Sequence, residues 1–284
     1  MGSYVLITGA TGGLGKALAA ECASRGWQLF LTDVSAERLS VLAQGLERLY
    51  GVDVAFLPCD LVDSVAREQM WDDLRRRGVR IRMLMNVAGV DFEGPFRERP
   101  LDELRAILRL NVEATVEMTR RVLGFRDPAG TLRIVNVASL AAYYPMPLKA
   151  AYAASKRFLL NFSLAVREEL RSSGVSVTVL CPGGMATNPD SIRGILAQGF
   201  WGRMTTLGVG EIAARTLDHA LGGRAVYVPG ILNQTLRLLG SLVPAEVVSS
   251  LIRGRWTEAR RASLGGSESS AEGGSVSQRL AVPS

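Results

Sequence analysis

A tyrosine and a lysine four residues apart have the types and spacing that proton transfer requires. Tyr152 and Lys156 lie in a stretch with helical spacing, so their side chains share one helix face. A phenol has an unperturbed pKa of about 10, and a nearby ammonium favours its ionised form. We therefore predict that Tyr152 donates a proton in a reduction and accepts one in an oxidation. Tyr143 and Tyr144 lack a lysine four residues further on, so packing or pocket lining is expected for both.

A glycine-rich loop follows the first apolar segment of the chain. Residues 8–15 are Thr-Gly-Ala-Thr-Gly-Gly-Leu-Gly, and a helix is expected to begin near Leu14. Glycines let the backbone approach a pyrophosphate closely, and the amino end of a helix stabilises its negative charge. The order of strand, loop and helix therefore predicts a dinucleotide cofactor.

Asp33 ends the second expected strand, where an acidic side chain accepts hydrogen bonds from the adenosine ribose. A 2′-phosphate at this place would meet a like charge. Gly12 precedes Gly13 and Val34 follows Asp33, so neither position supplies an arginine for such a phosphate. We predict NAD(H) as the preferred cofactor, with NADP(H) as the alternative. Capping of the helix expected to begin near residue 36 is the other role open to Asp33.

Composition argues against several other classes of protein. The chain has three cysteines with no CxxC pair and one histidine, His219, which is expected to be packed or at the surface. These support neither a disulfide framework, nor a metal site, nor a histidine-dependent triad. The net charge of +6 comes from scattered arginines, so no nucleic-acid partner is expected. No apolar run reaches the roughly 18 residues of a membrane span and no signal peptide is visible, so we expect a cytoplasmic protein.

Strand-like apolar segments alternate with helical patterns over most of the chain. Strands are expected at 4–8, 28–32, 52–57, 82–87, 131–138, 175–180 and 225–228, with helices near 13–25, 35–49, 62–77, 101–123, 150–173 and 209–221. Such alternation joins parallel strands through crossover helices. The sequence therefore predicts an α/β protein with a single doubly wound, Rossmann-like domain over residues 1–230. Its seven-stranded parallel sheet would carry helices on both faces.

The chain changes character after residue 230. Residues 231–262 are expected to form an amphipathic helical extension, in which Pro244 separates two helices. They could extend the core, cover the site, form a subunit contact or rest on a membrane surface. Residues 263–284 are rich in Ser and Gly and are expected to form a disordered tail.

Several motifs in this order resemble those of the short-chain dehydrogenase/reductase family, compact type. They are the glycine loop, Cys59-Asp60-Leu61, Asn86-Val87-Ala88-Gly89, Leu110-Asn111-Val112, Ser139 after an expected strand, Tyr152 with Lys156, and Pro182-Gly183. The resemblance covers about residues 3–230. It implies an NAD(P)(H)-dependent oxidoreductase that interconverts a secondary alcohol and a ketone. The glycine loop also satisfies the extended pattern TGxxGxxG, but too little chain follows Lys156 for a large sugar-nucleotide domain.

The resemblance also implies roles for single residues. Ser139 would stabilise the reacting oxygen, Lys156 would hydrogen-bond the nicotinamide ribose, and Asn111 would hold a water that connects Lys156 to solvent. The implied catalytic set is Asn111, Ser139, Tyr152 and Lys156. The implied cofactor-binding set is Gly9, Thr11, Gly13, Leu14, Gly15, Asp33, Asp60, Leu61, Asn86, Ala88, Gly89, Tyr152, Lys156, Pro182, Gly183 and Thr187. Val87 replaces an asparagine of the family and is expected to fill a buried sheet position, while helix capping remains an alternative role for Asp60.

The substrate is expected to be hydrophobic. Residues 185–206 carry large apolar side chains where related enzymes have a substrate lid, and Tyr143, Tyr144 and Met146 lie nearby in the sequence. An acyl chain, a polyketide or a steroid-like ring would suit such a pocket, although the same side chains could belong to the core. The resemblance suggests a homodimer or homotetramer. Two other functions stay open: an NAD-binding sensor without turnover, and an interaction protein that contacts membranes through residues 231–256.

Overall fold

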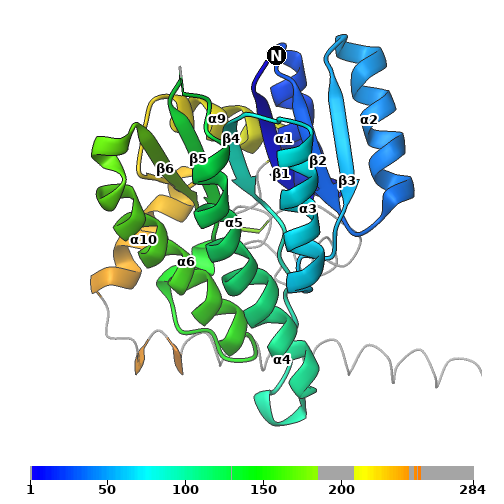
Figure 1. Cartoon of the computed structure of the whole chain (residues 1–284). Helices are drawn as coiled ribbons and strands as arrows, with labels where there is room; N and C mark the ends of the chain where they lie inside the picture. The colour runs from blue at the N-terminus through cyan, green and yellow to red at the C-terminus, as the bar shows by residue number, and fades with distance from the viewer. Residues whose placement is uncertain (1, 129, 185–207, 243–245, 248, 251–284) are drawn as a thin grey trace, which may run out of the picture.

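The computed structural model describes residues 2–128, 130–184, 208–242, 246–247 and 249–250. In these residues, seven strands form one sheet of order β3-β2-β1-β4-β5-β6-β7, and all neighbours are parallel (Figure 1). The strands are β1 (Tyr4–Thr8), β2 (Leu29–Asp33), β3 (Val54–Pro58), β4 (Ile81–Asn86), β5 (Leu132–Val137), β6 (Val175–Leu180) and β7 (Val226–Tyr227). The predicted α/β architecture, a Rossmann-like fold with seven parallel strands, is confirmed.

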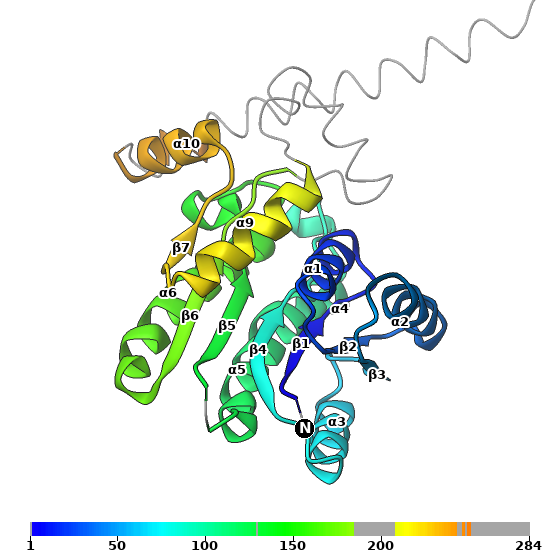
Figure 2. The same ribbon diagram turned by 90° about the horizontal axis from the view of Figure 1, so that it is seen from above.

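Helices cover both faces of the sheet (Figure 2). One face carries α1 (Gly13–Ser24), α2 (Ala36–Tyr50) and α9 (Val209–Leu221). The other carries α3 (Ser64–Arg76), α5 (Thr115–Val122) and α6 (Ala150–Glu169). Before α5 come α4 (Leu101–Ile107) and a π-helical segment, η2 (Leu108–Ala114). Because both faces are covered, the strands are apolar along nearly their whole length.

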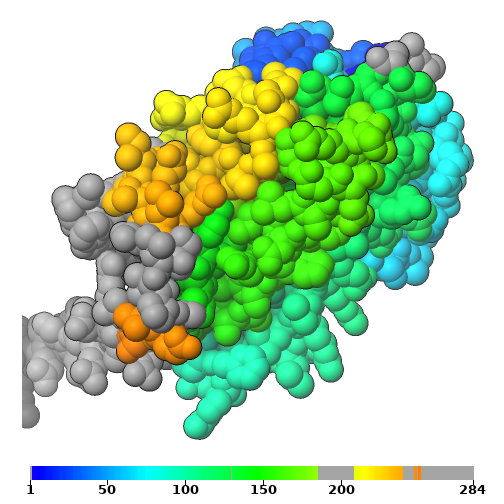
Figure 3. Space-filling model, turned by 90° about the vertical axis from the view of Figure 1, so that its left-hand side faces the viewer, coloured from blue at the N-terminus to red at the C-terminus, as the bar shows by residue number. Residues whose placement is uncertain are grey.

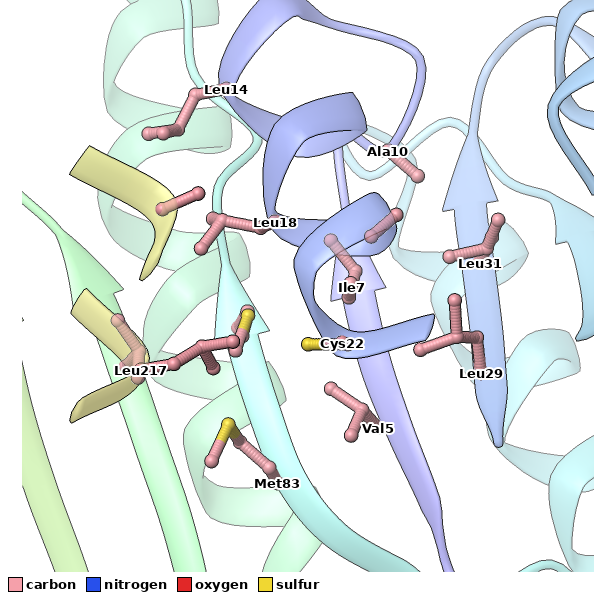
Figure 4. Packing of buried hydrophobic residues seen from close by; sticks show 14 of the residues in the cluster. Val5, Ile7, Ala10, Leu14, Leu18, Cys22, Leu29, Leu31, Met83 and Leu217 are labelled. Carbon is pink, nitrogen blue, oxygen red and sulfur yellow. The ribbon is translucent and has the colours of Figure 1, made fainter. Parts of the chain in front are cut away.

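The core is made by alternate side chains of the strands and the inner faces of the helices. In Figure 4, Cys22 of α1 lies beside Val5 and Ile7 of β1, whereas Leu18 points to the side of α1 where α9 lies, and all four side chains are fully buried. Apolar residues spaced three or four apart place one stripe of α1 against the sheet. This packing fixes α1 over β1 and therefore fixes the loop that joins them.

Helix bounds follow from local sequence chemistry. At α2, the Ser35 hydroxyl accepts a hydrogen bond from the Arg38 amide at 3.3 Å and caps the amino end. Gly51 ends the helix with a φ of +66°, a conformation that disfavours other residues. At α3 the cap is Asp63, whose Oδ1 accepts from the Val65 amide at 2.8 Å.

The sheet order places a crevice at the carboxyl edge of the central strands. β1 lies between β2 and β4, and the connection after β1 leads to the α1 face while the chain after β4 leads to the α5 face. In open parallel sheets, ligands bind where neighbouring connections diverge in this way. The topology therefore brings the ends of β1, β2, β4, β5 and β6 to one edge.

Most element bounds agree with the sequence-based expectations. β1, β6 and α9 coincide with the expected segments, and the other strands differ by no more than two residues at either end. The helix expected over 101–123 is instead interrupted by η2. The interruption lies at Asn111, and its geometry bears on the site described below.

After β7 the chain forms α10 (Ile231–Leu242), which contacts the short helix η4 (Leu140–Tyr143) and borders α9 on the surface (Figure 3). Asn233 of α10 is buried and its side chain lies against Gly183, so the start of the extension packs on the domain. The expected tail (263–284), the expected lid (185–206) and most of the second helix expected after Pro244 lie outside the described residues. Among the residues described, no helix is both long enough and apolar enough to cross a bilayer.

Candidate active site

The predicted site residues gather along the carboxyl edge of the sheet. Gly9 follows β1, Asp33 ends β2 and Asn86 ends β4. Ser139 follows β5 after one residue, and Pro182 comes two residues after the end of β6. Parallel strands end on the same side, so residues far apart in the sequence line one crevice.

The glycine loop closes tightly onto the start of α1. Gly9 has a φ of +62°, and a Cβ atom there would lie 2.8 Å from the Cα atom of Ala88. A Cβ atom on Gly15 would overlap the carbonyl oxygen of Gly9. Gly12 is the N-cap residue of α1, and no side chain caps this helix. The amides of its first turn are therefore available to an anion at the crevice.

Asp33 is bonded directly to this loop. Its Oδ2 accepts from the Thr11 amide at 2.9 Å and from the Thr11 hydroxyl at 2.8 Å. Its Oδ1 accepts from the Val34 amide at 2.8 Å. The capping role is not observed, because Ser35 caps α2. Asp33 thus orders the loop and places a negative charge at the end of β2. Two further members of the predicted set begin α1: Gly13, and Leu14, whose side chain is buried in the core.

The turn after β4 is held by a residue to which the sequence analysis gave no role. The Thr8 hydroxyl accepts hydrogen bonds from the Val87 amide at 3.0 Å and from the Ala88 amide at 3.1 Å. Thr8 is the first residue of the glycine motif, but its cross-strand contact depends on β1 lying beside β4. Val87 lies just after the end of β4 and is only partly buried against the core, so it does not fill the buried sheet position that was expected.

The Asn86 side chain serves the sheet. Its Nδ2 donates to the Asn136 Oδ1 at 2.8 Å and to the Thr119 hydroxyl at 3.2 Å. Asn136, on the adjacent strand β5, donates in turn to the Ser163 hydroxyl at 2.8 Å. A buried amide engaged in this way is directed into the protein. The family resemblance implies that Asn86 contacts the cofactor, and the backbone of Asn86, rather than its side chain, is available for that contact.

Asp60 and Leu61 follow the end of β3. Asp60 is exposed, and its Oδ1 accepts from the Val62 amide at 2.9 Å. It does not cap α3, because Asp63 does so. The Leu61 side chain is buried in the core, and its carbonyl oxygen accepts from the buried Arg67 at 2.6 Å. The groups of this pair that can contact the adenine side of a cofactor are therefore the exposed Asp60 side chain and the backbone.

Tyr152 and Ser139 meet in the crevice. Tyr152 lies in the first turn of α6, and Ser139 lies just after β5 as the N-cap residue of η4. The Ser139 hydroxyl lies near the Tyr152 phenol and acts to lower the pKa of Tyr152. The Ser139 Oγ also accepts from the Ala141 amide at 3.1 Å, which fixes its position. The two hydroxyl groups can therefore contact one reacting oxygen together.

Lys156 lies one helical turn after Tyr152 and is buried. Its Nζ lies 5.7 Å from the centroid of the Tyr152 ring and donates to the Val137 carbonyl oxygen at 2.9 Å. Burial lowers the pKa of Lys156 to about 8, although the Asp91 carboxylate acts in the opposite direction. Its ammonium still predominates at neutral pH.

Asn111 occupies the π-helical segment and is fully buried. Its Oδ1 accepts from the Val90 amide at 2.9 Å, and its Nδ2 donates to the Val90 carbonyl oxygen at 3.0 Å. The same Nδ2 donates to the Ser155 hydroxyl at 3.1 Å, and that hydroxyl donates to the Tyr152 carbonyl oxygen at 2.7 Å. Ser155, which had no predicted role, therefore links Asn111 to the start of α6. π-Helical insertions are frequent at functional sites.

Gly89 separates Asn111 from Lys156. A Cβ atom at this position would lie 3.1 Å from the Asn111 Oδ1 and 3.3 Å from the Lys156 Nζ. The turn after β4 thus approaches both side chains closely. The structure accordingly brings all four predicted catalytic residues into one neighbourhood.

Two charged groups beside Tyr152 were missed by the sequence analysis. Lys149, the N-cap residue of α6, has its Nζ 5.8 Å from the Tyr152 ring centroid and 2.5 Å from the Asp91 Oδ2. Burial raises the pKa of Tyr152 and Asp91 adds to the increase, whereas the Ser139 hydroxyl and the charge of Lys149 oppose it. No local motif signals this pair, because its members lie 58 residues apart.

The predicted residues after β6 have clear positions up to Gly183. The Pro182 carbonyl oxygen accepts from the Leu140 amide at 2.8 Å, which joins the ends of β5 and β6. A Cβ atom on Gly183 would lie 2.7 Å from the Asn233 Nδ2 of α10. Thr187 lies outside the described residues.

Tyr143, Tyr144 and His219, the other side chains considered for proton transfer, pack against neighbouring residues. The Tyr143 hydroxyl lies 3.8 Å from the Cys181 sulfur, and burial raises the pKa of Tyr143. Burial also raises the pKa of Tyr144, to about 12. His219 stacks on Tyr227, with ring centroids 4.1 Å apart, on α9. Packing or pocket lining was expected for the two tyrosines, and a packed or surface position for His219.

Comparisons with known proteins identify the family of this chain. The chain is 33% identical over 198 residues to a very-long-chain 3-oxoacyl-CoA reductase of Anas platyrhynchos, which covers 68% of this chain and 62% of that protein. It is 35% identical over 195 residues to sulfoacetaldehyde reductase 2 of Chromohalobacter salexigens, and the matched stretch covers 68% of this chain and 77% of that protein. A profile described as short chain dehydrogenase matches residues 3–192. The chain belongs to the short-chain dehydrogenase family.

A solved structure extends the similarity to the fold. A short-chain dehydrogenase from Sphingobium yanoikuyae in complex with NADPH superposes with a TM-score of 0.71 and 26% identity, covering 99% of this chain and 98% of that one. The chain matches less than two thirds of the length of the Anas protein but more than that of the Chromohalobacter one. Family membership confirms the resemblance drawn from the motifs and places the chain among oxidoreductases.

Proposed function

We propose that this short-chain dehydrogenase interconverts a secondary alcohol and a ketone with a nicotinamide dinucleotide. One observation carries the proposal: the Tyr152 phenol lies beside Ser139 and one helical turn from Lys156. These groups lie at the same sheet edge as the glycine loop. A proton donor next to a cofactor crevice suits carbonyl reduction.

The residues present fit a dinucleotide. The open amino end of α1 after Gly12 suits a pyrophosphate, because the amides of a first helical turn lack partners within the helix. The Asp33 carboxylate suits a ribose diol. On the far side of the crevice, Lys156 is within one turn of Tyr152 and suits the second ribose.

The protein's own part in the reaction is to hold the carbonyl and to move one proton. When bound, the cofactor supplies or accepts the hydride. The Ser139 hydroxyl, fixed by the Ala141 amide, donates to the substrate oxygen and stabilises its growing negative charge. The Tyr152 phenol transfers its proton to that oxygen in reduction and takes it back in oxidation. The Lys156 ammonium favours the phenolate that remains.

We further propose that NAD(H) is preferred over NADP(H). The Asp33 charge stands where a 2′-phosphate would approach, and the next residue is the exposed Val34. Burying or crowding two like charges is unfavourable. The Sphingobium relative is a complex with NADPH, so the preference rests on Asp33 alone.

A hydrophobic substrate is also a proposal. The partly buried Tyr143 and Leu140 pack beside the crevice on η4, and α10 lies against the same segment. The named activity of the Anas relative concerns a long acyl chain, which supports this substrate class. The Chromohalobacter relative is named for a small sulfonated aldehyde, so the two relatives define the contrast that a substrate screen must include.

Self-association is proposed from the surface of two helices. On α6, the Phe158 ring stacks on Phe162 with centroids 5.7 Å apart, and Phe158 is 42% exposed. Leu101 and Leu108, on α4 and η2, are also exposed. A second copy of the chain would bury these side chains. Light scattering of the protein and of a Phe158→Glu variant tests this.

An exposed apolar edge on α10 favours one second candidate, contact with a membrane surface. Ile231 and Leu238 are 85% and 62% exposed, and Arg237 lies on the same helix. Apolar residues with a neighbouring cation suit the interface of an anionic bilayer. Liposome co-sedimentation that survives Tyr152→Phe and is lost in Ile231→Ser with Leu238→Ser would support this role. A cytoplasmic location stays a prediction.

Turnover assays with Tyr152→Phe test the main proposal. Long-chain 3-oxoacyl thioesters, steroid-like ketones and sulfoacetaldehyde are offered with NADH and with NADPH. The variant is expected to bind NADH as the wild type does while losing about 10² to 10⁴-fold in turnover. Tyr50→Phe, at the exposed end of α2, is the matched control and should retain full activity. Equal turnover in Tyr152→Phe and wild type would refute the proposed role of the phenol.

A further inference from the structure

The stretch before α6 is held in an unusual conformation. Leu148 has a φ of +67°, the only positive φ among the described residues other than glycine. This conformation is unfavourable for an L-residue by roughly 1–2 kcal/mol, so surrounding contacts must maintain it. The Leu148 carbonyl oxygen accepts from the Gly94 amide at 2.9 Å. The chain before α6 is thereby joined to the loop that follows the Asn86 turn.

This junction brings one ammonium and two carboxylates together. The Lys149 Nζ lies 2.5 Å from the Asp91 Oδ2 and 3.3 Å from the Glu93 Oε2. The Lys149 and Asp91 side chains are 18% and 30% exposed, so solvent screens their charges only in part. Burial alone would lower the pKa of Lys149, but Asp91 and Glu93 outweigh it and raise that pKa. Lys149 therefore stays protonated at high pH.

The cluster lies against the catalytic phenol. The Tyr152 ring has two ammonium groups at nearly equal distances from its centroid, Lys149 at 5.8 Å and Lys156 at 5.7 Å. They differ in protonation, because the pKa of Lys156 is lowered to about 8 by burial. Above that pH, Lys149 is the ammonium that remains beside the phenol.

We propose that the Lys149–Asp91 ion pair is an electrostatic control on proton exchange at Tyr152. The inference rests on the proposed function. Lys149 favours the phenolate and Asp91 opposes it, so each partner of the ion pair offsets part of the other's effect on the phenol. Lys149 acts through Tyr152 and is a positioning residue rather than a catalytic one.

The other groups around the phenol complete this electrostatic environment. Ser139, after β5, lies beside the Tyr152 phenol, and Lys156 faces that phenol from α6. Glu93 belongs to the Lys149 cluster, but its 3.3 Å distance is longer than that of Asp91. Cys181, after β6, opposes the lowering of the Lys156 pKa. Asp91 also acts on Lys156, where it favours the charged form.

A purely structural role for the pair makes a different prediction. If the ion pair only fastens the loop to α6, removing either partner should loosen the site alike and move any Tyr152 titration in the same direction. Electrostatic control requires opposite shifts. Lys149→Met leaves Asp91 unbalanced and should raise the pKa of Tyr152. Asp91→Asn leaves Lys149 unbalanced and should lower it.

The test measures ionisation of Tyr152 without any turnover. Near-ultraviolet absorbance of tyrosinate is recorded against pH for each protein and for the same protein carrying Tyr152→Phe, and the difference isolates one phenol. Shifts of about half to one pH unit are expected, upward in Lys149→Met and downward in Asp91→Asn. Lys149→Arg should restore the wild-type midpoint, and Glu93→Gln should move it less than Asp91→Asn. Shifts of the same sign, or no Tyr152 step in Asp91→Asn below the pH of unfolding, would overturn the inference.

A second measurement separates this inference from the proposed function. The pH dependence of kcat/KM for alcohol oxidation should move with the phenol in the same two variants. If turnover depends on Tyr152 but the pH profile of kcat/KM is the same in both variants as in the wild type, the ion pair does not control proton exchange at Tyr152. The assignment as an enzyme would then still stand. If the phenol shifts as expected but no substrate is turned over, the electrostatic inference holds and the proposed reaction is wrong.

Discussion

The ammonium of Lys156 shares one face of α6 with the Tyr152 ring, yet it donates its hydrogen bond to the Val137 carbonyl oxygen, 2.9 Å away. Lys156 is therefore anchored to the end of β5 before any ligand arrives. An anchored cation keeps its position relative to the phenol. Burial at this anchor is also what lowers the pKa of Lys156 to about 8.

The first prediction concerns stability against pH. The folded pKa of Lys156 is about 8 and the unfolded value is 10.5, so the unfolded chain binds more protons between these values. The contribution of Lys156 to stability is lowest below pH 8 and rises towards pH 10.5, by about 3 kcal/mol in all. Lys156→Met should remove this rise. Denaturant unfolding of both proteins from pH 7 to pH 10 measures the difference, and parallel curves would contradict the assigned pKa.

The second prediction concerns cofactor choice. Asp33→Asn keeps a side chain that can accept from the Thr11 amide but removes the charge. NADPH binding should strengthen roughly tenfold or more relative to NADH binding, which is about 1.4 kcal/mol. Fluorescence titration with both nucleotides gives the two Kd values. Asp102→Asn, the same change at an exposed position on α4 outside the predicted cofactor-binding set, is the control. An unchanged ratio would remove Asp33 as the selecting residue.

The third prediction concerns the close approach of Gly89. In Gly89→Ala, the added carbon would lie 3.3 Å from the Lys156 Nζ and 3.1 Å from the Asn111 Oδ1, so one of these side chains must shift. We expect kcat/KM to fall at least tenfold, because displacement of a catalytic group by a fraction of an ångström is costly. Gly45→Ala, within α2 and with nothing near its Cβ position, should leave activity unchanged and stabilise the protein by about 0.5–1 kcal/mol.

The fourth prediction concerns Asn111. Removal of its amide in Asn111→Ala leaves the amide and carbonyl groups of Val90 without their side-chain partner. The free energy of unfolding should fall by about 1–3 kcal/mol, since buried polar groups lose their hydrogen bonds. Thermal unfolding of this variant is compared with that of Asn161→Ala, an exposed change on α6 that should stay within about 0.5 kcal/mol of the wild type.

Local patterns were sufficient for most of the fold and for much of the site. Apolar runs bounded by turn residues gave β1 and β6 at their observed positions, and the fourfold spacing of Tyr152 and Lys156 placed both on α6. The π-helical segment at Asn111 could not be predicted, because its apolar spacing is compatible with an ordinary helix. Its geometry depends on bonds from Asn111 to Val90, which only the folded chain brings near.

The same reason explains the residues that were missed. The role of Thr8 depends on its hydrogen bonds with the turn after β4. The role of Lys149 depends on its ion pair with Asp91, in the loop that follows the same strand. The side-chain amide of Asn86 likewise donates to Asn136 on the adjacent strand, and this contact depends on the order of strands in the sheet. Such contacts follow from tertiary structure rather than from spacing along the chain.

The central place of β1 in the sheet affects how the chain can fold as it is synthesised. One side of β1 pairs with β2, but the other side pairs with β4, whose Met83 lies opposite Val5. A nascent chain that ends before β4 therefore leaves one edge of its first strand open, and such edges recruit other strands. The Thr8 hydroxyl also cannot accept its hydrogen bond from the Val87 amide until residue 87 has been synthesised. Amino-terminal fragments that stop short of residue 86 should be more prone to aggregation and proteolysis than longer ones.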